Sequence, residues 1–180
     1  MVQKINVGII FGGKSAEHEV SLQSAKNIVA ALEKEKYNPI LIGIDKSGKW
    51  LLNSSSQLLL ENHSPELAGP SQTAILPSSD LFESNKIDVA FPVLHGTFGE
   101  DGTVQGFLKL AGIPFVGASV LGSAVGMDKD VMKRLLRDAD LPIANFLCYK
   151  GPSYVNFEVV VNELSLPFFV KPCNLGSSVG

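Results

Sequence analysis

The sequence predicts an α/β fold in which a doubly wound, mostly parallel sheet forms the first part of the chain. Two observations carry this prediction. Short, near-continuous apolar runs of strand length recur over the first 120 residues or so, as in strands that are buried on both faces of a sheet. Amphipathic helical patterns separate these runs, and strands that alternate with helices are typical of parallel sheets.

The first elements form a strand, a helix and a second strand. Residues 5–11 (INVGIIF) make an apolar run that Gly12 and Gly13 end. From Glu17, apolar residues recur at helical spacing over about five turns, with charged residues on the opposite side. Residues 39–44 (PILIGI) make a second buried strand, and the following DKSGKW predicts a turn into a short further strand. The sequence therefore predicts a β-α-β unit.

The next stretch, residues 53–86, is rich in Ser, Asn and Pro and has little periodicity, so we expect mostly irregular surface, with His63 solvated. Residues 87–94 (IDVAFPVL) predict the next buried strand, which runs into HGTFGEDG. An amphipathic helix follows, and Gly112 supplies its stop signal. Residues 114–117 (PFVG) predict another short strand.

A domain boundary is expected near Gly126, where the pattern changes. Residues 1–125 are predicted to form one domain, and residues 126–180 to begin a second that has too few elements to close a core alone. The elements expected in the second part are a helix capped by Asp128 and ended by Pro142, a strand over 145–149, a helix over 154–164 and a strand over 168–171.

Composition excludes several classes of protein. Of the 180 residues, 45% are hydrophobic and 18% charged, and the net charge is -3, which favours neither disorder nor a basic surface for nucleic acid. Cys148 and Cys173 lie far apart without a CxxC motif, so we expect two buried free thiols rather than a disulfide framework or a zinc site. No run of 18 apolar residues occurs. We therefore expect a soluble cytoplasmic protein that binds neither nucleic acid nor membrane.

The segment FGGKSAEHE, residues 11–19, is the first candidate for chemistry, because ligands of doubly wound sheets bind outside the carboxyl ends of the strands. Its glycines do not make GxGxxG, and two carboxylates beside them would repel a pyrophosphate, so a dinucleotide site is disfavoured. Two interpretations of Glu17 and Glu19 stay open. Both can stabilise a helix N-terminus, each by about 0.3–1 kcal/mol, or one of them can hold an ammonium group.

The segment HGTFGEDG, residues 95–102, is the second candidate. Its glycines allow backbone N–H groups close to a ligand, and the helix start near Asp101 favours an anion such as a substrate carboxylate. The alternative is a helix cap with a tight turn, in which His95 is a strand-end histidine with its hydrogen bonds satisfied.

The segment FVKPCNLGSSVG, residues 169–180, is the third candidate. Lys171 ends a predicted strand and a small, polar loop follows, which can fold its amides over nucleotide phosphates although it is not a Walker A motif. Lys129 offers a second cation. Either lysine alone is more often a solvated surface residue, and only the pair together with the Gly-Ser loop favours a phosphate site.

Five segments in this order resemble the N-terminal half of the D-alanine-D-alanine ligase family, of the ATP-grasp superfamily. They are FGGKSAEHEVSLQSA, LHGTFGEDGTVQG, GIPFVG, MDKDVMKRLL and FVKPCNLGSSVG. The resemblance covers the chain except residues 53–86. It implies a Rossmann-like N-terminal domain that binds D-alanine, followed by the first part of an ATP-grasp domain. It also implies a cytoplasmic homodimer that serves peptidoglycan precursor synthesis, and thereby cell shape.

The family's site residues carry over by position, as the resemblance implies them. Glu17 and Ser177 would be catalytic, with Glu17 binding the ammonium of the first D-alanine and Ser177 linking it to a tyrosine beyond Gly180. His95 and Gly96 would lie beside that D-alanine. Cys173 and Leu175 depart from the family pattern of alanine or serine and a polar residue. The residues that would contact ATP are Lys129, Lys171, Gly176, Ser177 and Ser178, and the ligands of Mg²⁺ or Mn²⁺ are expected beyond Gly180.

The reaction that the resemblance implies is the ATP-dependent joining of two D-alanine molecules through an acyl phosphate. Ligases of the same family that use D-lactate or D-serine as the second substrate remain an alternative, and the 180-residue chain alone is expected to be inactive. Two other classes are weaker. A nicotinamide-dependent oxidoreductase would need GxGxxG and an acid about 20 residues further on, and neither is present. A non-catalytic binding module fits the α/β fold but not the loop after Lys171.

Overall fold

A computed structural model describes residues 3–61, 74–75 and 79–176, so His63, Ser177 and Ser178 lie outside the described residues. The chain divides into two compact units, Met1–Ala124 and Val125–Gly180. The boundary falls within one helix, α5 (Val120–Met127).

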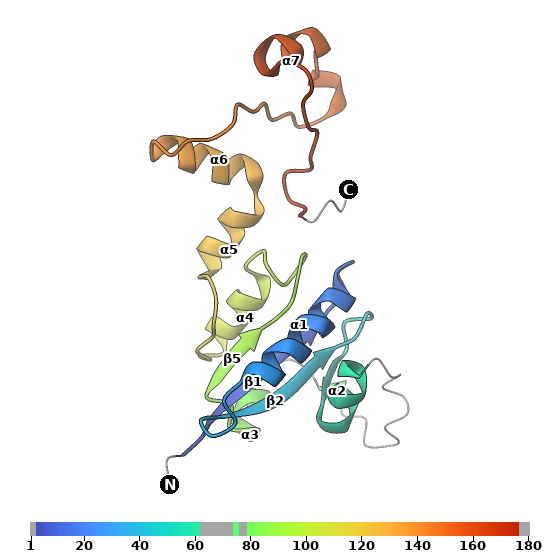
Figure 1. Cartoon of the computed structure of the whole chain (residues 1–180), viewed down its shortest axis with the longest axis vertical. Coiled ribbons are helices and arrows are strands. Elements are labelled where there is room, and N and C mark those ends of the chain that lie inside the picture. Colours follow the sequence, from blue (N-terminus) through green and yellow to red (C-terminus); the bar gives the residue numbers. More distant parts are fainter. Residues whose placement is uncertain (1–2, 62–73, 76–78, 177–180) are drawn as a thin grey trace. The chain divides into compact units, whose positions relative to one another are not determined.

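The first unit is built on a five-stranded sheet with the order β4-β3-β2-β1-β5. Figure 1 shows β1 and β2 as long neighbouring arrows, with β5 beside β1. The central strand β1 pairs in parallel with both β2 and β5, whereas β3 and β4 pair antiparallel. The predicted α/β class with a mostly parallel sheet is confirmed. The strands are β1 (Ile5–Gly12), β2 (Tyr37–Ile44), β3 (Trp50–Leu52), β4 (Ala74–Ile75) and β5 (Val89–Pro92).

Both faces of the sheet are covered, which explains the continuous apolar run of β1. Ile10 points to a cluster with Val104 and Leu108 of α4 (Thr103–Leu110) and with side chains of α3 (Ser79–Ser84). Ile9, together with Val7 and Phe11 two residues to either side, points to a second cluster with α1 (His18–Ala31) and α2 (Asn53–Leu60). Successive side chains of a strand face opposite sides. Each side of β1 therefore needs apolar residues.

Residues 53–86 are more regular than we predicted, because α2, β4 and α3 lie among them. The serine-rich start of α2 looked like a loop, yet Ser56 is fully buried. Its hydroxyl donates to the carbonyl of Leu51 at 2.5 Å and accepts from the N–H of Gly43 at 3.2 Å. Leu59 and Leu60 of the same helix are core residues. The serine-rich composition suggested a loop, but this segment is a helix in which the buried Ser56 hydroxyl has both a donor and an acceptor partner.

Two smaller expectations for the first unit also need correction. The α1 helix has 14 residues, about four turns rather than five. The predicted strand over residues 114–117 is only an isolated parallel bridge between Ala90 and Phe115. Hydrogen bonds from Ala90 N–H to Pro114 and from Val116 N–H to Ala90 make it, and the chain turns away afterwards.

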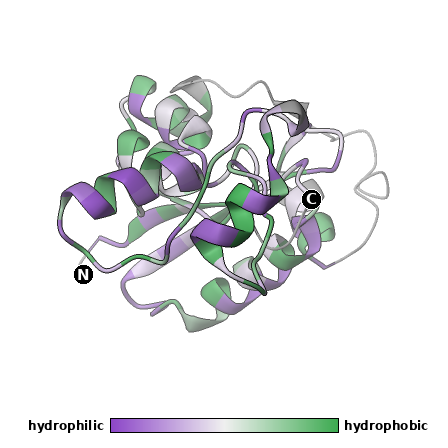
Figure 2. Cartoon of the chain, turned by 90° about the horizontal axis from the view of Figure 1, so that it is seen from above, coloured by the Kyte–Doolittle hydropathy of each residue, from purple (hydrophilic) through white to green (hydrophobic). Residues whose placement is uncertain are grey.

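The second unit contains α6 (Lys129–Asp138), a 3-10 turn η2 (Pro152–Tyr154) and α7 (Phe157–Leu164). Asp128 caps α6 as predicted, and Asn156 caps α7 in the same way. The predicted helix over 154–164 therefore begins three residues later. Figure 2 shows that helical ribbons of the chain carry both hydrophilic and hydrophobic residues.

The two strands predicted for the second unit, over 145–149 and 168–171, are not formed among the described residues. A strand needs a neighbour to receive its hydrogen bonds, and the described part of this unit offers these segments none. Their apolar side chains stay open to solvent, with Phe169 89% and Val170 88% exposed. The two strand predictions were therefore wrong for the described structure.

Candidate active site

The candidate site lies at the carboxyl ends of β1 and β5. These two parallel strands are neighbours, and the chain leaves β1 toward β2 on the opposite side, so the crevice between them is a topological switch point. Gly12 ends β1 with φ +90°, and a Cβ there would lie 2.1 Å from the carbonyl oxygen of Ile44. Gly96 in the opposite loop has φ +70°. Both loops need glycine for their shape.

Two serines join the loops that follow β1 and β5. The buried Ser21 hydroxyl donates to the carbonyl of Val93 at 2.5 Å and accepts from the N–H of Gly12 at 2.8 Å. The Ser15 hydroxyl donates to the carbonyl of His95 at 2.7 Å. The bonds to Val93 and His95 cross to the end of β5 and the loop after it, whereas the bond from Gly12 fixes Ser21 to the end of β1, so the two sides of the crevice are held together.

The two acids of FGGKSAEHE have different surroundings. Glu19 forms an ion pair with Lys46 at 2.8 Å, and the hydrogen bond from Lys46 lowers the pKa of Glu19 below its ordinary value. Glu17 begins α1, where its N–H donates to the Ser15 hydroxyl at 3.1 Å, but its carboxylate makes no cap hydrogen bond. Within the described part of the chain, no hydrogen bond or ion pair engages the Glu17 carboxylate.

The Glu17 carboxylate instead lies against the opposite loop. A Cβ on Gly96 would come within 3.0 Å of Glu17 Oε2. Glu100 approaches the same glycine, because its Oε2 accepts the N–H of Gly96 at 2.8 Å. Two carboxylates therefore flank Gly96, and a position between like charges favours a cation. The arrangement suits an ammonium group better than an anion.

Histidines of the two loops serve different purposes. His18 is only 3% exposed, and its Nδ1 lies 2.7 Å from the carbonyl of Gly13. Since a carbonyl only accepts, Nδ1 of His18 carries the proton and fixes the glycine turn. His95 is half-buried beside Gly96, and its Nε2 lies 3.1 Å from the hydroxyl of Ser24. His95 is therefore oriented by α1 at the crevice.

The start of α4 is occupied by a side chain of the protein. Asp101 accepts the N–H of Phe98 at 2.9 Å and that of Thr103 at 3.0 Å. Partial burial opposes ionisation of Asp101, but the hydrogen bonds from Thr103 and Phe98 outweigh it and lower its pKa. These contacts match the helix-cap alternative for HGTFGEDG, and the amides that could have met a substrate carboxylate here are used by Asp101.

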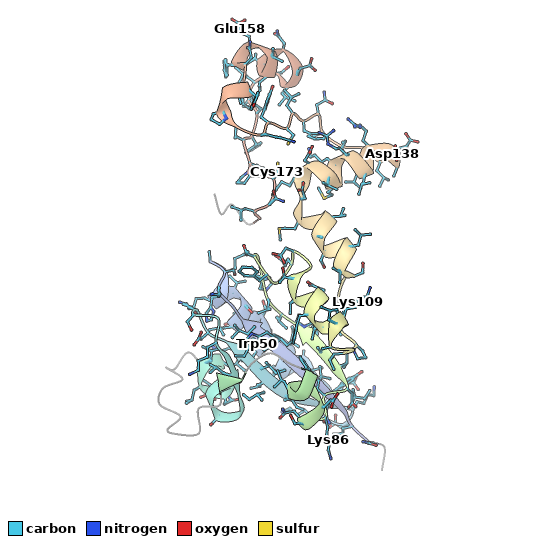
Figure 3. The ribbon with its side chains drawn as sticks, turned by 180° about the vertical axis from the view of Figure 1, so that it is seen from behind. Trp50, Lys86, Lys109, Asp138, Glu158 and Cys173 are labelled. Atoms are coloured by element: carbon cyan, nitrogen blue, oxygen red, sulfur yellow. The ribbon has the colours of Figure 1, made fainter. Side chains whose placement is uncertain are left out.

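A pocket of about 320 Å³ adjoins the same loops. Trp50, labelled in Figure 3, packs edge-on against Phe107 with ring centroids 5.8 Å apart and forms one wall. Lys14 brings the only ammonium in the lining described for this pocket. The volume suits a small organic molecule. The lining comprises Gly12, Gly13, Lys14, Ile44, Gly48, Trp50, Leu94, His95, Thr97, Phe98, Thr103, Val104 and Phe107.

The predicted phosphate contacts lie in the second unit. The Lys129 ammonium donates to the carbonyls of Pro172, at 3.1 Å, and Leu175, so it is tied to the loop that follows Lys171. The Lys171 ammonium lies 5.4 Å from the ring centre of Phe169 and is otherwise solvated. Gly176 has no atom within 4 Å of where a Cβ would stand. Lys171 thus immediately precedes the 172–176 loop, and Lys129 lies at the start of α6.

Within 3–61, 74–75 and 79–176, no three His, Cys, Asp or Glu side chains gather closely enough to hold a metal ion. The predicted location of the Mg²⁺ ligands beyond Gly180 stays a prediction. The helices of these segments are also too short or too polar to span a bilayer.

Sequence reasoning missed Ser15 and Ser21, which connect the loops. For Ser21 a signal was available, because it lies one turn before Ala25 on the apolar face of α1, where a hydroxyl must find partners. The loop contacts of Ser15 depend on β5 lying beside β1, which no local pattern reveals.

Comparison with known proteins adds independent information. Residues 6–118 match the family described as D-ala D-ala ligase N-terminus. The D-alanine--D-alanine ligase of Oceanobacillus iheyensis is 50% identical over 192 aligned positions, which cover 98% of this chain and 52% of the relative. The chain spans about half the length of the curated relatives it matches.

Solved structures of ligases also match this chain over about half of their own length. The D-alanine-D-alanine ligase from Coxiella burnetii matches with a TM-score of 0.82 and 36% identity, covering 98% of this chain and 55% of that one. The VanG D-Ala:D-Ser ligase from Enterococcus faecalis matches with a TM-score of 0.78 and 34% identity, covering 98% and 54%.

Proposed function

Because the chain belongs to the D-alanine-D-alanine ligase family, of which it forms the N-terminal portion, we propose that it binds the first D-alanine of an ATP-dependent ligase that joins two D-alanine molecules. In this proposal the chain acts together with the portion that its relatives carry beyond the matched half. The product, D-alanyl-D-alanine, would enter peptidoglycan precursor synthesis in the cytoplasm, and the ligase would work as a homodimer.

The observation that carries the proposal is the place of the Glu17 carboxylate. It lies against Gly96, Glu100 approaches the same residue, and no described side chain neutralises Glu17. An amino acid in this crevice would present its ammonium to Glu17. The ion pair would keep that amine protonated, and a protonated amine is no nucleophile, so the first D-alanine could react only through its carboxylate.

The chemistry would begin when the carboxylate of the first D-alanine attacks the γ-phosphate of ATP, so that the bond to the β-phosphate breaks, ADP leaves and an acyl phosphate forms. The free amine of the second D-alanine attacks the acyl carbon, and phosphate leaves from the tetrahedral intermediate. Positioning and charge neutralisation are the protein's tasks, because a carboxylate must approach a triphosphate that is itself negatively charged. His95, oriented by Ser24, would line the wall beside the first D-alanine.

Cations of the second unit would meet the nucleotide. Lys171 is free of acidic partners among the described residues, and Lys129 donates to loop carbonyls. On binding ATP, the Lys129 ammonium would exchange carbonyl oxygens for phosphate oxygens, which carry more charge. Gly176, Ser177 and Ser178 would then close over the phosphates. Mg²⁺ or Mn²⁺ would neutralise the triphosphate, with ligands outside the described residues.

The second substrate has one alternative with a specific observation behind it. The VanG D-Ala:D-Ser ligase from Enterococcus faecalis is 34% identical to this chain. We therefore also consider D-serine, and D-lactate with it, as the second substrate. The residues that contact the first D-alanine do not separate these choices, because that D-alanine is common to all three reactions.

The proposed function is tested with a chimera that continues this chain after Gly180 with the corresponding remainder of the Oceanobacillus iheyensis relative. ADP release from MgATP is measured with D-alanine alone, with D-alanine plus D-serine and with D-alanine plus D-lactate, and the products are separated by chromatography. We expect D-alanyl-D-alanine from D-alanine alone. D-alanine binding without ADP release would favour the non-catalytic binding module.

A further inference from the structure

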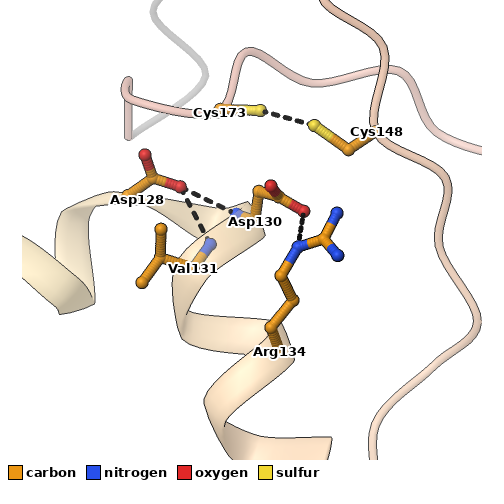
Figure 4. A network of polar contacts seen from close by, with 6 residues as sticks. All are labelled: Asp128, Asp130, Val131, Arg134, Cys148 and Cys173. Carbon is orange, nitrogen blue, oxygen red and sulfur yellow. Dashed lines mark hydrogen bonds and ion pairs between the residues drawn. The ribbon is translucent and has the colours of Figure 1, made fainter.

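The two cysteines of the second unit lie side by side although 25 residues separate them. Their Sγ atoms are 3.7 Å apart, and Figure 4 shows the two thiols pointing toward each other above the first turn of α6. Cys148 is exposed and Cys173 is half-buried, and both are free thiols. Both thiols are free as expected, but the expected burial was wrong, since Cys148 is exposed and Cys173 is only half-buried.

The loop of Cys173 is anchored on α6. The N–H of Lys129 donates to the carbonyl of Cys173 at 3.0 Å, and the Lys129 ammonium donates to carbonyls on either side of it. The Asn174 amide donates to the capping carboxylate of Asp128 at 2.9 Å. The Cys173 thiol is therefore held in place beside Cys148.

We propose that Cys148 and Cys173 form a reversible intramolecular disulfide that ties the 172–176 loop to the extended segment 145–149. A disulfide has an S–S distance of about 2.05 Å, so each sulfur atom has to move by less than about 1 Å from its present place. The proposal goes beyond the ligase function, since the bond forms whether or not a nucleotide or D-alanine binds.

The reaction needs an oxidant, for which a low-molecular-weight disulfide such as oxidised glutathione suffices. One cysteine thiolate attacks the glutathione disulfide, forms a mixed disulfide and releases one glutathione thiolate. The second cysteine thiolate attacks the protein sulfur of that mixed disulfide and releases the other. The protein loses two electrons and two protons, and one glutathione disulfide becomes two thiols.

The surroundings also indicate a slow reaction near neutral pH. The hydrogen bond with Cys173 and the nearby Asp130 carboxylate raise the pKa of Cys148 above its ordinary value. Asp130 is itself paired with Arg134 at 2.8 Å. A thiol attacks only as its thiolate. The raised pKa therefore slows attack by Cys148 near neutral pH.

The consequence falls on the loop that carries the predicted phosphate contacts. Cys173 lies two residues after Lys171 and three before Gly176. A disulfide at Cys173 would add a covalent tie to the contacts with α6. The backbone of residues 173–176 would then be more restricted, and its amides should exchange their hydrogens more slowly.

The purified wild-type chain is equilibrated with oxidised and reduced glutathione, free thiols are blocked, and the intact mass and linked peptides are measured. We expect a monomer that has lost two hydrogens, with the Cys148 and Cys173 peptides joined and dithiothreitol restoring both thiols. The effective concentration should exceed the millimolar values of flexible linkers. Slower hydrogen exchange over residues 173–176 in the oxidised form is also expected.

The serine variants Cys148→Ser and Cys173→Ser are matched controls, since each leaves one thiol, and each should take up one glutathione. Wild-type protein that carries two glutathiones, or that forms only intermolecular dimers, would overturn the proposal. Unchanged exchange over residues 173–176 after oxidation would overturn the claim that the bond ties the loop. These readouts use wild-type protein, so they do not depend on the folding of either variant.

Discussion

The Glu17 carboxylate lies so close to Gly96 that a methyl group on this glycine would meet Glu17 Oε2 at 3.0 Å. This relationship joins two segments that are far apart in the sequence, the start of α1 and the loop after β5. It places an acid without a described partner at the switch point of the sheet. Changes at either residue should therefore affect the same ligand.

Gly96→Ala in the chimera should raise the KM for the first D-alanine by about tenfold, which corresponds to about 1.4 kcal/mol. The added methyl group displaces the Glu17 carboxylate, and φ +70° is unfavourable for alanine. Steady-state kinetics at saturating ATP measure the effect. Gly106→Ala is the control, because no atom lies within 4 Å of its added Cβ, and it should leave the KM unchanged. Equal values for the two variants would contradict the placement of the site.

Ser21→Ala should lower the free energy of unfolding by about 1–3 kcal/mol, because it leaves the buried Gly12 N–H without its partner. Urea denaturation of the 180-residue chain measures the loss. Gln23→Ala on the same helix removes an exposed hydrogen bond to Asn27 and should change stability by less than about 0.5 kcal/mol. If Ser21→Ala were as mild, the serine would not connect the two loops.

Lys171→Ala in the chimera should weaken ATP binding about tenfold or more, about 1.4 kcal/mol per decade, because it removes a cation from the proposed phosphate site. Titration with a fluorescent ATP analogue measures the dissociation constant. Lys150→Ala, on an exposed turn of the same unit, is the control and should bind ATP normally. Similar losses for both lysines would mean that the phosphates bind elsewhere.

The 180-residue chain on its own should fold in its first unit and form no D-alanyl-D-alanine. Its first unit has a sheet with both faces covered, which supports a cooperative thermal transition. Residues 126–176 should exchange amide hydrogens faster, because apolar side chains such as Phe169 are solvent-exposed there. A coupled ADP assay with D-alanine and MgATP tests activity. Dipeptide above background would refute this prediction.

Much of the first unit could be predicted from sequence because its signals are local. The apolar run of β1, the glycine turn and the apolar face of α1 each specify an element without knowledge of its neighbours. Ser56 shows the limit, since only its buried partners Leu51 and Gly43 distinguish the start of a helix from a loop.

The site was predicted less completely, for the same reason. Glu17 and Glu19 are both glutamates at the start of α1, so the sequence alone does not distinguish them. Lys46, which comes from the turn after β2, distinguishes them by pairing with Glu19. At the start of α4, Asp101 accepts the N–H groups of Phe98 and Thr103, a pair of contacts that the sequence left open as the alternative to a bound anion. Which acid stays free is a tertiary property that depends on contacts between distant segments.

The central claim is that Glu17 holds the ammonium of the first D-alanine. The most direct test is the KM for that substrate in the chimera that carries Glu17→Gln. A charge-assisted contact is worth about 1.5–3 kcal/mol, so the KM for the first D-alanine should rise about tenfold to a hundredfold, with little change in the KM for ATP. Glu19→Gln, which breaks only the surface pair with Lys46, is the matched control and should behave as the parent chimera. Unchanged D-alanine kinetics in Glu17→Gln would contradict the account and leave Glu17 as a helix-terminal charge.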